Sequence, residues 1–204
     1  MRILWTLVIG VLLLGLTTAA LAQGGREIRF RVVSNSRDYS LHVEFWRDHS
    51  RFYYSDWRGF IVAALDPATG ELLSDVGRFD TWGTSETGEQ MRRMIAHLNT
   101  QPNGTLFLLA VCDEAGLNRW DRCDFYDYPW VTDALLTLEA LGSTTIRSYC
   151  YRYSWAMIAL KGDGYALTEA VGSYVRQPVS VETTIVLPVE PTTWGQIKAT
   201  FSAD

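Results

Sequence analysis

The sequence of 204 residues has few of the side chains from which catalytic and metal centres are usually built. Its three histidines, His42, His49 and His97, lie far apart along the chain, so we interpret them as surface residues rather than metal ligands. It also lacks a phosphate-binding glycine loop, a zinc-ligand spacing and a serine placed as in a nucleophile elbow. These absences predict a protein that uses no metal ion and no other cofactor.

An excess of positive charge is also missing. The chain has 18 lysine and arginine residues against 23 aspartate and glutamate residues, a formal net charge of −5. Proteins that bind nucleic acids need an excess of basic side chains to meet the phosphates, so we do not expect a nucleic-acid partner. The content of 48% hydrophobic and 20% charged residues is typical of a globular domain and excludes disorder of the whole chain.

The longest apolar run lies at the start of the sequence. Residues 3–16 are almost wholly apolar, follow Arg2 and precede small residues that end at Ala22, which predicts a signal peptide over residues 1–22. The run is shorter than the roughly 20 residues that span a bilayer, so we expect no stable membrane insertion after cleavage. Residues 23–204 then form a single secreted domain, whose three cysteines allow one disulfide and leave one thiol.

Hydrophobic patterning predicts strands and two helices. Residues 26–65 alternate apolar and polar side chains between turn signals, as strands do. Residues 105–111 and 155–160 are nearly continuous apolar runs, which predicts two buried strands in the same core. Residues 91–98 and 131–141 have helical spacing. The predicted fold class is α+β, because the helices are few and turns connect most neighbouring strands.

Two features could carry chemistry. The acidic residues Asp80, Asp113 and Glu114 follow predicted strands and could supply the carboxylates of a glycoside hydrolase, although such residues also cap turns or face water. The segment 119–130 interleaves charged and aromatic side chains, and flat apolar faces beside hydrogen-bonding groups suit a sugar ring. The alternative is that these rings pack the segment onto the domain. The aromatic residues are Trp120, Phe125, Tyr126, Tyr128 and Trp130.

A series of short blocks occurs in a fixed order along the chain. The blocks are RGFIV at 58–62, LDPATGE at 65–71, RFDTW at 78–82, PNGT at 102–105, DEA at 113–115, LGS at 141–143 and YRYSWA at 151–156. This order resembles the ILEI/PANDER domain family, densely over residues 58–162 and loosely to both termini. The resemblance implies a compact β-β-α domain with two antiparallel sheets flanked by short helices, found in secreted cytokine-like proteins and in larger extracellular or Golgi proteins, and not an enzyme.

The resemblance also implies a ligand site. In the stem region of an O-mannose N-acetylglucosaminyltransferase a similar domain is a lectin for β-linked N-acetylglucosamine, and the matching polar positions here are Arg78, Asp113 and Arg152, with Trp155 behind them. A carboxylate and two guanidinium groups are directional partners for sugar hydroxyls and an amide carbonyl. Alternatively, the two arginines neutralise Asp80 and Asp113 and only hold the sheets together.

The sequence departs from the family pattern near this implied site. Tyr153 stands where an acidic residue is usual, Cys112 stands where a basic residue is common, and residues 118–130 resemble an insertion. Because Cys112 and Cys123 enclose the start of that insertion, we predict that they form a disulfide. A bond between Cys112 and Cys150 is the alternative, because the resemblance places both beside the site.

Residues 103–105 read Asn-Gly-Thr, an acceptor sequence for N-glycosylation in a predicted exposed turn. We expect Asn103 to be modified if the chain passes through a eukaryotic secretory pathway.

Taken with the resemblance, the sequence predicts a non-catalytic, secreted, lectin-like module that binds a glycan, with β-linked N-acetylglucosamine as the candidate sugar. An extracellular signalling or adhesion domain that binds a protein partner is the alternative. A glycoside hydrolase comes third.

Overall fold

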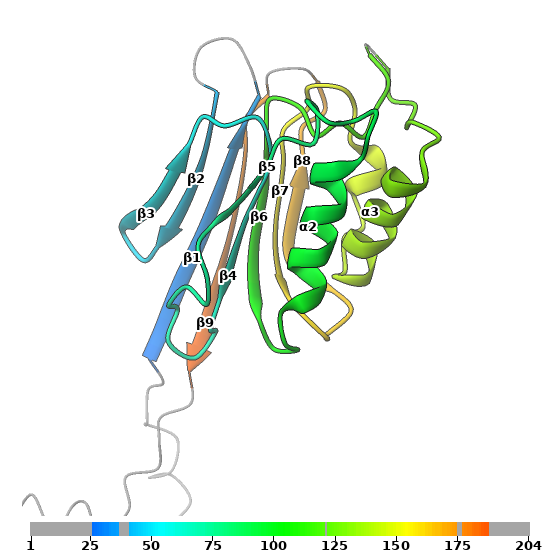
Figure 1. Ribbon diagram of the computed structural model, residues 1–204. Coiled ribbons are helices and arrows are strands. Elements are labelled where there is room, and N and C mark those ends of the chain that lie inside the picture. The colour runs from blue at the N-terminus through cyan, green and yellow to red at the C-terminus, as the bar shows by residue number, and fades with distance from the viewer. Residues whose placement is uncertain (1–25, 37–40, 121, 175–176, 188–204) are drawn as a thin grey trace, which may run out of the picture. The chain divides into compact units, whose positions relative to one another are not determined.

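The computed structural model describes residues 26–36, 41–120, 122–174 and 177–187 (Figure 1). The predicted signal peptide, residues 1–22, lies outside the described residues. Residues 28–185 form one compact unit, and the two ends of the chain are grouped as a second unit, of which only residues 26–27 and 186–187 are described. Neither helix among the described residues is long and apolar enough to cross a membrane.

The first sheet has four strands in the order β3-β2-β1-β9. Its pairing places Val32 opposite Phe45. Alternate residues of β1, including Ile28, Phe30 and Val32, are fully buried, which confirms the predicted inward face. The strand bounds are β1 (Arg26–Asn35), β2 (His42–Arg47), β3 (Ser50–Ser55) and β9 (Val179–Leu187).

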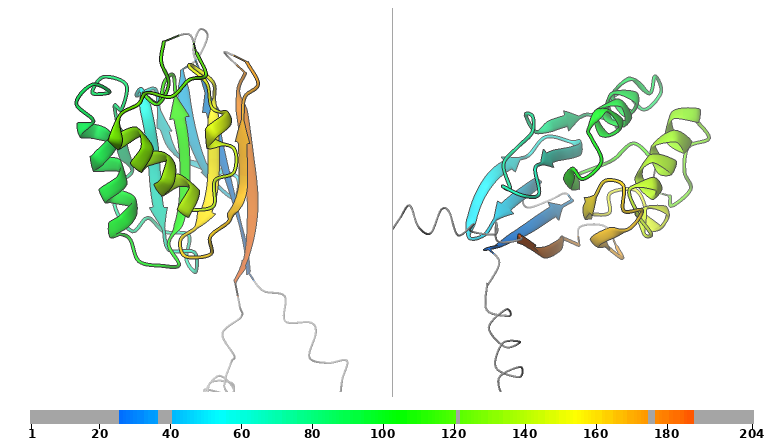
Figure 2. Two further views of the ribbon diagram at one scale, coloured as in Figure 1. Left: turned by 90° about the vertical axis from the view of Figure 1, so that its right-hand side faces the viewer. Right: turned by 90° about the horizontal axis from the view of Figure 1, so that it is seen from below.

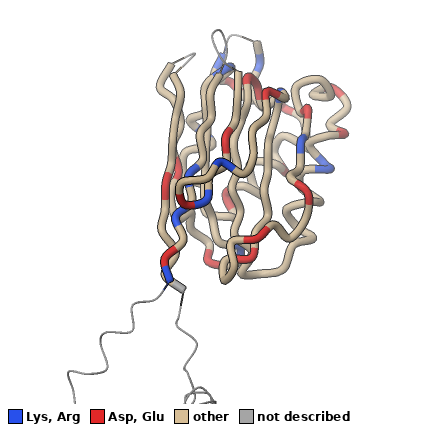
Figure 3. Tube along the Cα trace, turned by 90° about the vertical axis from the view of Figure 1, so that its left-hand side faces the viewer, with Lys and Arg blue, Asp and Glu red and all other residues tan. Residues whose placement is uncertain are grey.

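Charges of both signs are interspersed along the outer face of this sheet (Figure 3). Arg51 pairs with Glu44 at 2.6 Å, and Arg29 pairs with Glu182 at 3.5 Å. Trp46 lies between two cross-strand neighbours, since the guanidinium carbons of Arg31 and Arg51 are 4.4 and 5.9 Å from its ring centroid. This face is therefore largely charge-balanced by pairs within the sheet itself.

The second sheet has five strands in the order β5-β4-β6-β7-β8. The predicted buried strands are confirmed: β6 is buried at every position, β7 at all but Leu160, and the two are antiparallel neighbours with Leu108 opposite Ile158. The strand bounds are β4 (Gly59–Leu65), β5 (Gly77–Phe79), β6 (Leu106–Cys112), β7 (Trp155–Leu160) and β8 (Ala166–Val171).

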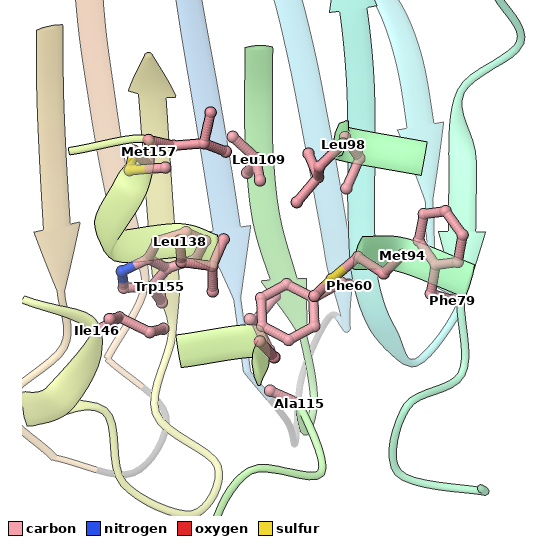
Figure 4. Close-up of a cluster of buried hydrophobic side chains, with 14 of the residues drawn as sticks. Phe60, Phe79, Met94, Leu98, Leu109, Ala115, Leu138, Ile146, Trp155 and Met157 are labelled. Atoms are coloured by element: carbon pink, nitrogen blue, oxygen red, sulfur yellow. The ribbon is translucent and has the colours of Figure 1, made fainter. Parts of the chain in front are cut away.

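Continuous apolar strands form here because both faces of the second sheet are covered. The four-stranded sheet lies on one face and the helices on the other (Figure 2). The helices are α2 (Glu89–Thr100) and α3 (Pro129–Ala140), followed by a short 3-10 helix, η1 (Ile146–Ser148). Met94 and Leu98 of α2 and Leu138 of α3 point into the core together with Phe60 and Trp155 (Figure 4).

The predicted α+β class is wrong, because the domain is mostly β. Nine strands in two antiparallel sheets account for most of the regular structure among the described residues, against two α-helices. Both helices cover the same face of the second sheet, and its other face is covered by the first sheet (Figure 2). The sequence pattern identified most of the elements but not β8 or η1, and the two antiparallel sheets that the family resemblance implied are present.

A buried serine joins the two sheets near the ends of β6 and β7. Ser34 of β1 donates a hydrogen bond to the carbonyl of Val111 at 2.5 Å and accepts one from the backbone N–H of Trp155 at 3.1 Å. Next along the chain, the backbone N–H of Ser36 donates to Ser154 Oγ at 3.0 Å. Because a buried polar group must be hydrogen-bonded, these contacts fix the register of one sheet against the other at this edge.

Both predicted cysteine pairings are wrong. The disulfide joins Cys123 to Cys150, 27 residues apart, and Cys112 is a free thiol. Cys112 is the last residue of β6 and is fully buried, whereas Cys123 is exposed and lies beside the chain that follows η1, where the N–H of Tyr151 donates to the carbonyl of Arg122 at 3.2 Å. Closeness in sequence to the insertion was therefore a poor guide to which thiols meet.

Candidate ligand-binding site

Two of the predicted site residues come together where β6 ends and β7 begins. Asp113 directly follows β6, and Arg152 stands three residues before β7. Because the two strands are antiparallel neighbours, these positions share one edge of the sheet. Arg152 Nε lies 3.8 Å from Asp113 Oδ1, and both of these atoms are buried, while the side chains as a whole are 24% and 17% exposed.

The backbone at both residues has an unusual conformation. Asp113 and Arg152 each have a φ of 60°, which lies in the left-handed region that residues other than glycine rarely adopt. Glu114 stabilises this arrangement, since its carboxylate accepts hydrogen bonds from the N–H of Arg152 at 2.7 Å and of Gly116 at 3.0 Å. Such backbone conformations cluster at ligand sites, where the surrounding structure holds them in place.

The side chain of Glu114 is buried. Glu114 is 1% exposed, and this burial raises its pKa to about 8, against the opposing effect of the hydrogen bond from Gly116. The neighbouring charge of Asp113 raises the pKa further. Glu114 therefore shapes the loop from inside and is not available to a ligand.

The third acidic residue, Asp80, is bound to an arginine that the sequence analysis did not assign to the site. Arg58 donates to Asp80 through Nε at 3.0 Å and through Nη2 at 2.9 Å. Burial alone would raise the pKa of Asp80, but the hydrogen bonds from Arg58 and Gly83 hold it below its ordinary value. Glu114 is thus enclosed, and Asp80 is paired with Arg58 as Asp113 is with Arg152.

Arg58 belongs to the same edge as Asp113. It immediately precedes β4, whose first residue, Gly59, is opposite Cys112. The hydrogen bond to Asp80 raises the pKa of Arg58 most, and the charges of Asp113 and Glu114 add to the rise. The RGFIV block contained this residue, but its place beside Asp113 depends on the pairing of β4 with β6, which spacing along the sequence does not indicate.

An aromatic cluster lies beside the charged pair. The guanidinium carbon of Arg152 is 4.8 Å from the ring centroid of Tyr151, and Trp120 stacks on Tyr151 at a centroid distance of 5.7 Å. Trp82 is 5.6 Å from Tyr151 and 6.0 Å from Trp120. Trp120 is 63% exposed, so the cluster offers a flat apolar surface that is joined to Arg152 through the ring of Tyr151.

A glycine allows this cluster to form. Gly116 has a φ of 68°, and a Cβ atom there would lie 2.3 Å from the carbonyl oxygen of Thr81. The close approach brings the chain at Trp82 against the loop that follows β6.

The aromatic rings of the segment 119–130 are divided between one exposed ring and several that pack onto the domain. Trp120 joins the exposed cluster, whereas Tyr128 stacks between Tyr126 and Trp130 at centroid distances of 5.3 and 4.9 Å. Those three rings and Phe125 pack against the hydrophobic core. The segment thus anchors itself through most of its rings and presents one of them.

The two other predicted site residues lie elsewhere. Trp155 is fully buried and donates through Nε1 to Glu169 at 2.9 Å, so it belongs to the core and is no ligand contact. Arg78 is exposed, lies over the ring of Trp57 at 5.4 Å, and lines a pocket that neither Asp113 nor Arg152 lines. No group of three or more metal-ligating side chains occurs within the part of the chain that the structure describes.

The domain is thus a mostly β fold of two antiparallel sheets with helices on one face, and charged and aromatic side chains gather where β6 ends and β7 begins. The family described as interleukin-like EMT inducer matches residues 58–163, just over half of the chain, and the chain belongs to this family. The match confirms the resemblance in the sequence. It indicates an extracellular domain of the cytokine-like or binding type.

Curated relatives match a somewhat longer stretch. The cell migration-inducing and hyaluronan-binding proteins of Homo sapiens and Mus musculus are each 28% identical to this chain over 126 residues. The alignment covers 61% of this chain but only 8% of each relative. The similarity therefore concerns one domain of much longer proteins.

Proposed function

We propose that the edge formed by Asp113, Arg152 and Trp120 binds a glycan, which makes the domain a lectin-like module. The observation that carries this proposal is the ion pair of Asp113 and Arg152 linked through Tyr151 to an exposed indole ring, since the guanidinium of Arg152 lies over Tyr151 and Trp120 stacks on the same ring. A sugar can stack its apolar face on the indole while its hydroxyls bond to the carboxylate and the guanidinium.

The arrangement is held ready before a ligand arrives. Glu114 fixes the backbone of Arg152, and the ring of Tyr151 lies beneath the guanidinium of Arg152. Groups that are already ordered lose little conformational freedom on binding, so more of the interaction energy remains as affinity.

The chemistry of the edge favours an uncharged sugar. Asp113 offsets Arg152, and Asp80 offsets Arg58, so the site carries paired charges rather than an excess of one sign. β-Linked N-acetylglucosamine fits such a site, because its amide and hydroxyl groups both donate and accept hydrogen bonds. The relatives are named as hyaluronan-binding, and hyaluronan is a glycan, which supports a glycan ligand for this domain as a class.

Replacing Asp113 by alanine is expected to weaken the binding of chitobiose, a β-linked disaccharide of N-acetylglucosamine, by about tenfold or more, because a charge-assisted hydrogen bond is lost. The melting temperature should change little, since a partly exposed ion pair contributes little to stability. Isothermal titration and thermal melts measure the two effects. Asp163→Ala, which removes an exposed carboxylate in the turn after β7, serves as the control.

A second variant separates chemistry from backbone strain. Asparagine tolerates a positive φ better than alanine does, so Asp113→Asn keeps the backbone and removes only the charge. We expect it to restore part of the affinity. Chitobiose affinity that is unchanged in Asp113→Ala would contradict the proposal.

A protein-binding signalling or adhesion role is the alternative, favoured by the interleukin-like description of the family. It would replace the glycan proposal if two results were obtained. A purified protein partner would bind the domain without competition from sugars, and Asp113→Ala would change neither the affinity for that partner nor the binding of the domain to an array of glycans.

Asn103 is expected to carry an N-linked glycan when the chain is made in a eukaryotic secretory pathway. It is exposed in the turn between α2 and β6 and lies at the border of a groove that includes Leu136 of α3. Treatment with an N-glycosidase should reduce the mass of the purified protein, and Asn103→Gln should already have the lower mass. Identical masses before and after treatment would refute this expectation.

A further inference from the structure

One face of the indole of Trp120 is covered, and the other is open. Trp120 stacks on Tyr151 at a centroid distance of 5.7 Å with 21° between the two ring planes, so Tyr151 covers one face of the indole. Trp82 is tilted by 55° to Trp120 and is not stacked on it. Because Trp120 is nonetheless 63% exposed, its free face is the one turned away from Tyr151.

The ring of Tyr151 links the indole to the ion pair. The guanidinium carbon of Arg152 is 4.8 Å from the centroid of this ring, and Tyr151 is only 5% exposed. Among the residues that the structure describes, Tyr151 supplies the one ring over which Arg152 lies. A ligand group on the free face of Trp120 is therefore separated from Arg152 by the indole itself and by the ring of Tyr151.

The ion pair and the indole also offer different kinds of contact. Asp113 Oδ1 and Arg152 Nε are buried and lie 3.8 Å apart, so the exposed part of each side chain consists of its other atoms. Carboxylate and guanidinium groups bind the hydroxyl and amide groups at the rim of a sugar ring. The free face of Trp120 instead suits the flat apolar face of a sugar ring. Two kinds of contact at two separate positions fit two rings better than one.

We propose that the site binds a β-linked oligosaccharide through two neighbouring rings, one hydrogen-bonded to Asp113 and Arg152 and the next stacked on the free face of Trp120. This inference rests on the proposed function and adds the class of ligand, which is a chain of at least two rings rather than a single sugar. A chain can bridge the two contacts, whereas a single ring meets only one of them because the ring of Tyr151 separates them.

The loop that carries Trp120 is held in place without a ligand. The backbone N–H of Arg119 donates to the carbonyl of Asp124 at 2.9 Å, and the disulfide ties Cys123 to Cys150, the residue before Tyr151. An indole that is already ordered loses little conformational freedom on binding, so its stacking on a second ring remains as affinity.

Two sugars of different length test the proposal: methyl β-N-acetylglucosaminide, which has one ring, and chitobiose, which has two. Titrations followed by NMR measure both affinities, including the weak binding of a single sugar. Chitobiose should bind about tenfold more tightly than the single sugar, because the second ring adds the contact with the indole. Trp120→Ala should remove this gain and leave the affinity for the single sugar unchanged. Trp120→Phe should keep part of the gain.

Tyr165→Ala is the matched control. Tyr165 is 58% exposed, close to the exposure of Trp120, but it lies in the turn after β7, whereas Arg152 lies before that strand. The control should leave both affinities unchanged. The indole N–H signal of Trp120, identified by its absence in Trp120→Phe, gives a direct readout. It should shift when chitobiose is added and stay in place when the single sugar is added.

The outcomes separate this inference from the function on which it rests. Equal affinities of the wild type for the two sugars would overturn the inference and leave the proposed function in place. An equal loss of both affinities in Trp120→Ala would also overturn it, since Trp120 would then act on the ion pair through Tyr151 and not on a second ring. Absence of any binding of either sugar to the wild type would refute the proposed function, and the inference with it.

Discussion

The free energy of unfolding is expected to fall by about 3–4 kcal/mol when Cys123 and Cys150 are both replaced by serine. The disulfide closes a segment of 27 residues that includes α3, and its loss lets the unfolded chain explore many more conformations. Urea unfolding curves of the oxidised wild type and the double variant measure the difference. Cys112→Ala serves as the control, since it removes a thiol and leaves the disulfide intact.

The same pairing predicts which cysteine reacts with a thiol reagent. Burial raises the pKa of Cys112 to about 12, so its thiol should react slowly in the folded protein and readily after denaturation without a reductant. Peptide mapping should then find one label per chain, on Cys112. Label on Cys123 or Cys150 would contradict the pairing.

Loss of the disulfide should also reach the ligand site. Cys150 immediately precedes Tyr151 and Arg152, and Cys123 holds the chain that carries Trp120. Without the bond, the stacking of Trp120 on Tyr151 has less support, so the double variant should bind chitobiose more weakly than the wild type. Equal affinity would mean that the hydrophobic packing of the segment 119–130 is enough to position Trp120.

The domain should become less stable as the pH rises from 6.5 to 8. The pKa of Glu114 is about 8 in the folded state, against a reference value of 4.5 that stands for the unfolded chain. Between these two pH values the folded state therefore binds more protons than the unfolded state. The free energy of unfolding therefore falls as the pH rises, by at most about 1.4 kcal/mol per pH unit. The pKa of His97 is lowered and has the opposite effect, but only below about pH 6.5, its reference value.

Glu114→Gln tests the origin of that pH dependence. The amide has one accepting oxygen, so one of the backbone N–H groups of Arg152 and Gly116 loses its partner, which should cost about 1–3 kcal/mol at pH 6.5. The deficit should shrink by pH 8, because the wild type alone loses stability over this interval. Urea unfolding at several pH values measures both effects. A variant that keeps the slope of the wild type would show that another group titrates.

Local patterns predicted most of the elements of this fold correctly. The alternation at Ile28, Phe30 and Val32 and the apolar runs of β6 and β7 reflect burial on one face or on both, and each pattern can be read within a few residues. The predicted fold class was wrong because the proportion of helix to strand in the domain depends on which elements cover the two faces of the second sheet. Both α-helices and most of the strands, though not β8, gave local signals, but no local signal indicates that the first sheet covers the second.

The residues of the candidate site also fall into two groups, those assigned from the local sequence and those placed only by strand pairing. Asp113 and Arg152 were assigned from the family blocks, and the sequence pattern had already identified the strand that Asp113 directly follows and the strand that begins three residues after Arg152. Arg58 directly precedes β4, and Arg78 lies within β5. Only the pairing of β4 with β5 and β6 shows which of the two arginines lies at the same end of the sheet as Asp113. Register is set by contacts between distant segments, so it is absent from the spacing of either arginine.

By itself, the sequence determined the family, the buried strands, the two helices and the loop residues Asp113 and Arg152, because each depends on side chains close together along the chain. Only the tertiary structure decided the order of the strands in the two sheets, the pairing of Cys123 with Cys150, the stacking of Trp120 on Tyr151 and the separate place of Arg78. Each of these joins segments that are far apart in sequence. Their proximity results from the packing of the whole core, in which many contacts act together and none is encoded locally.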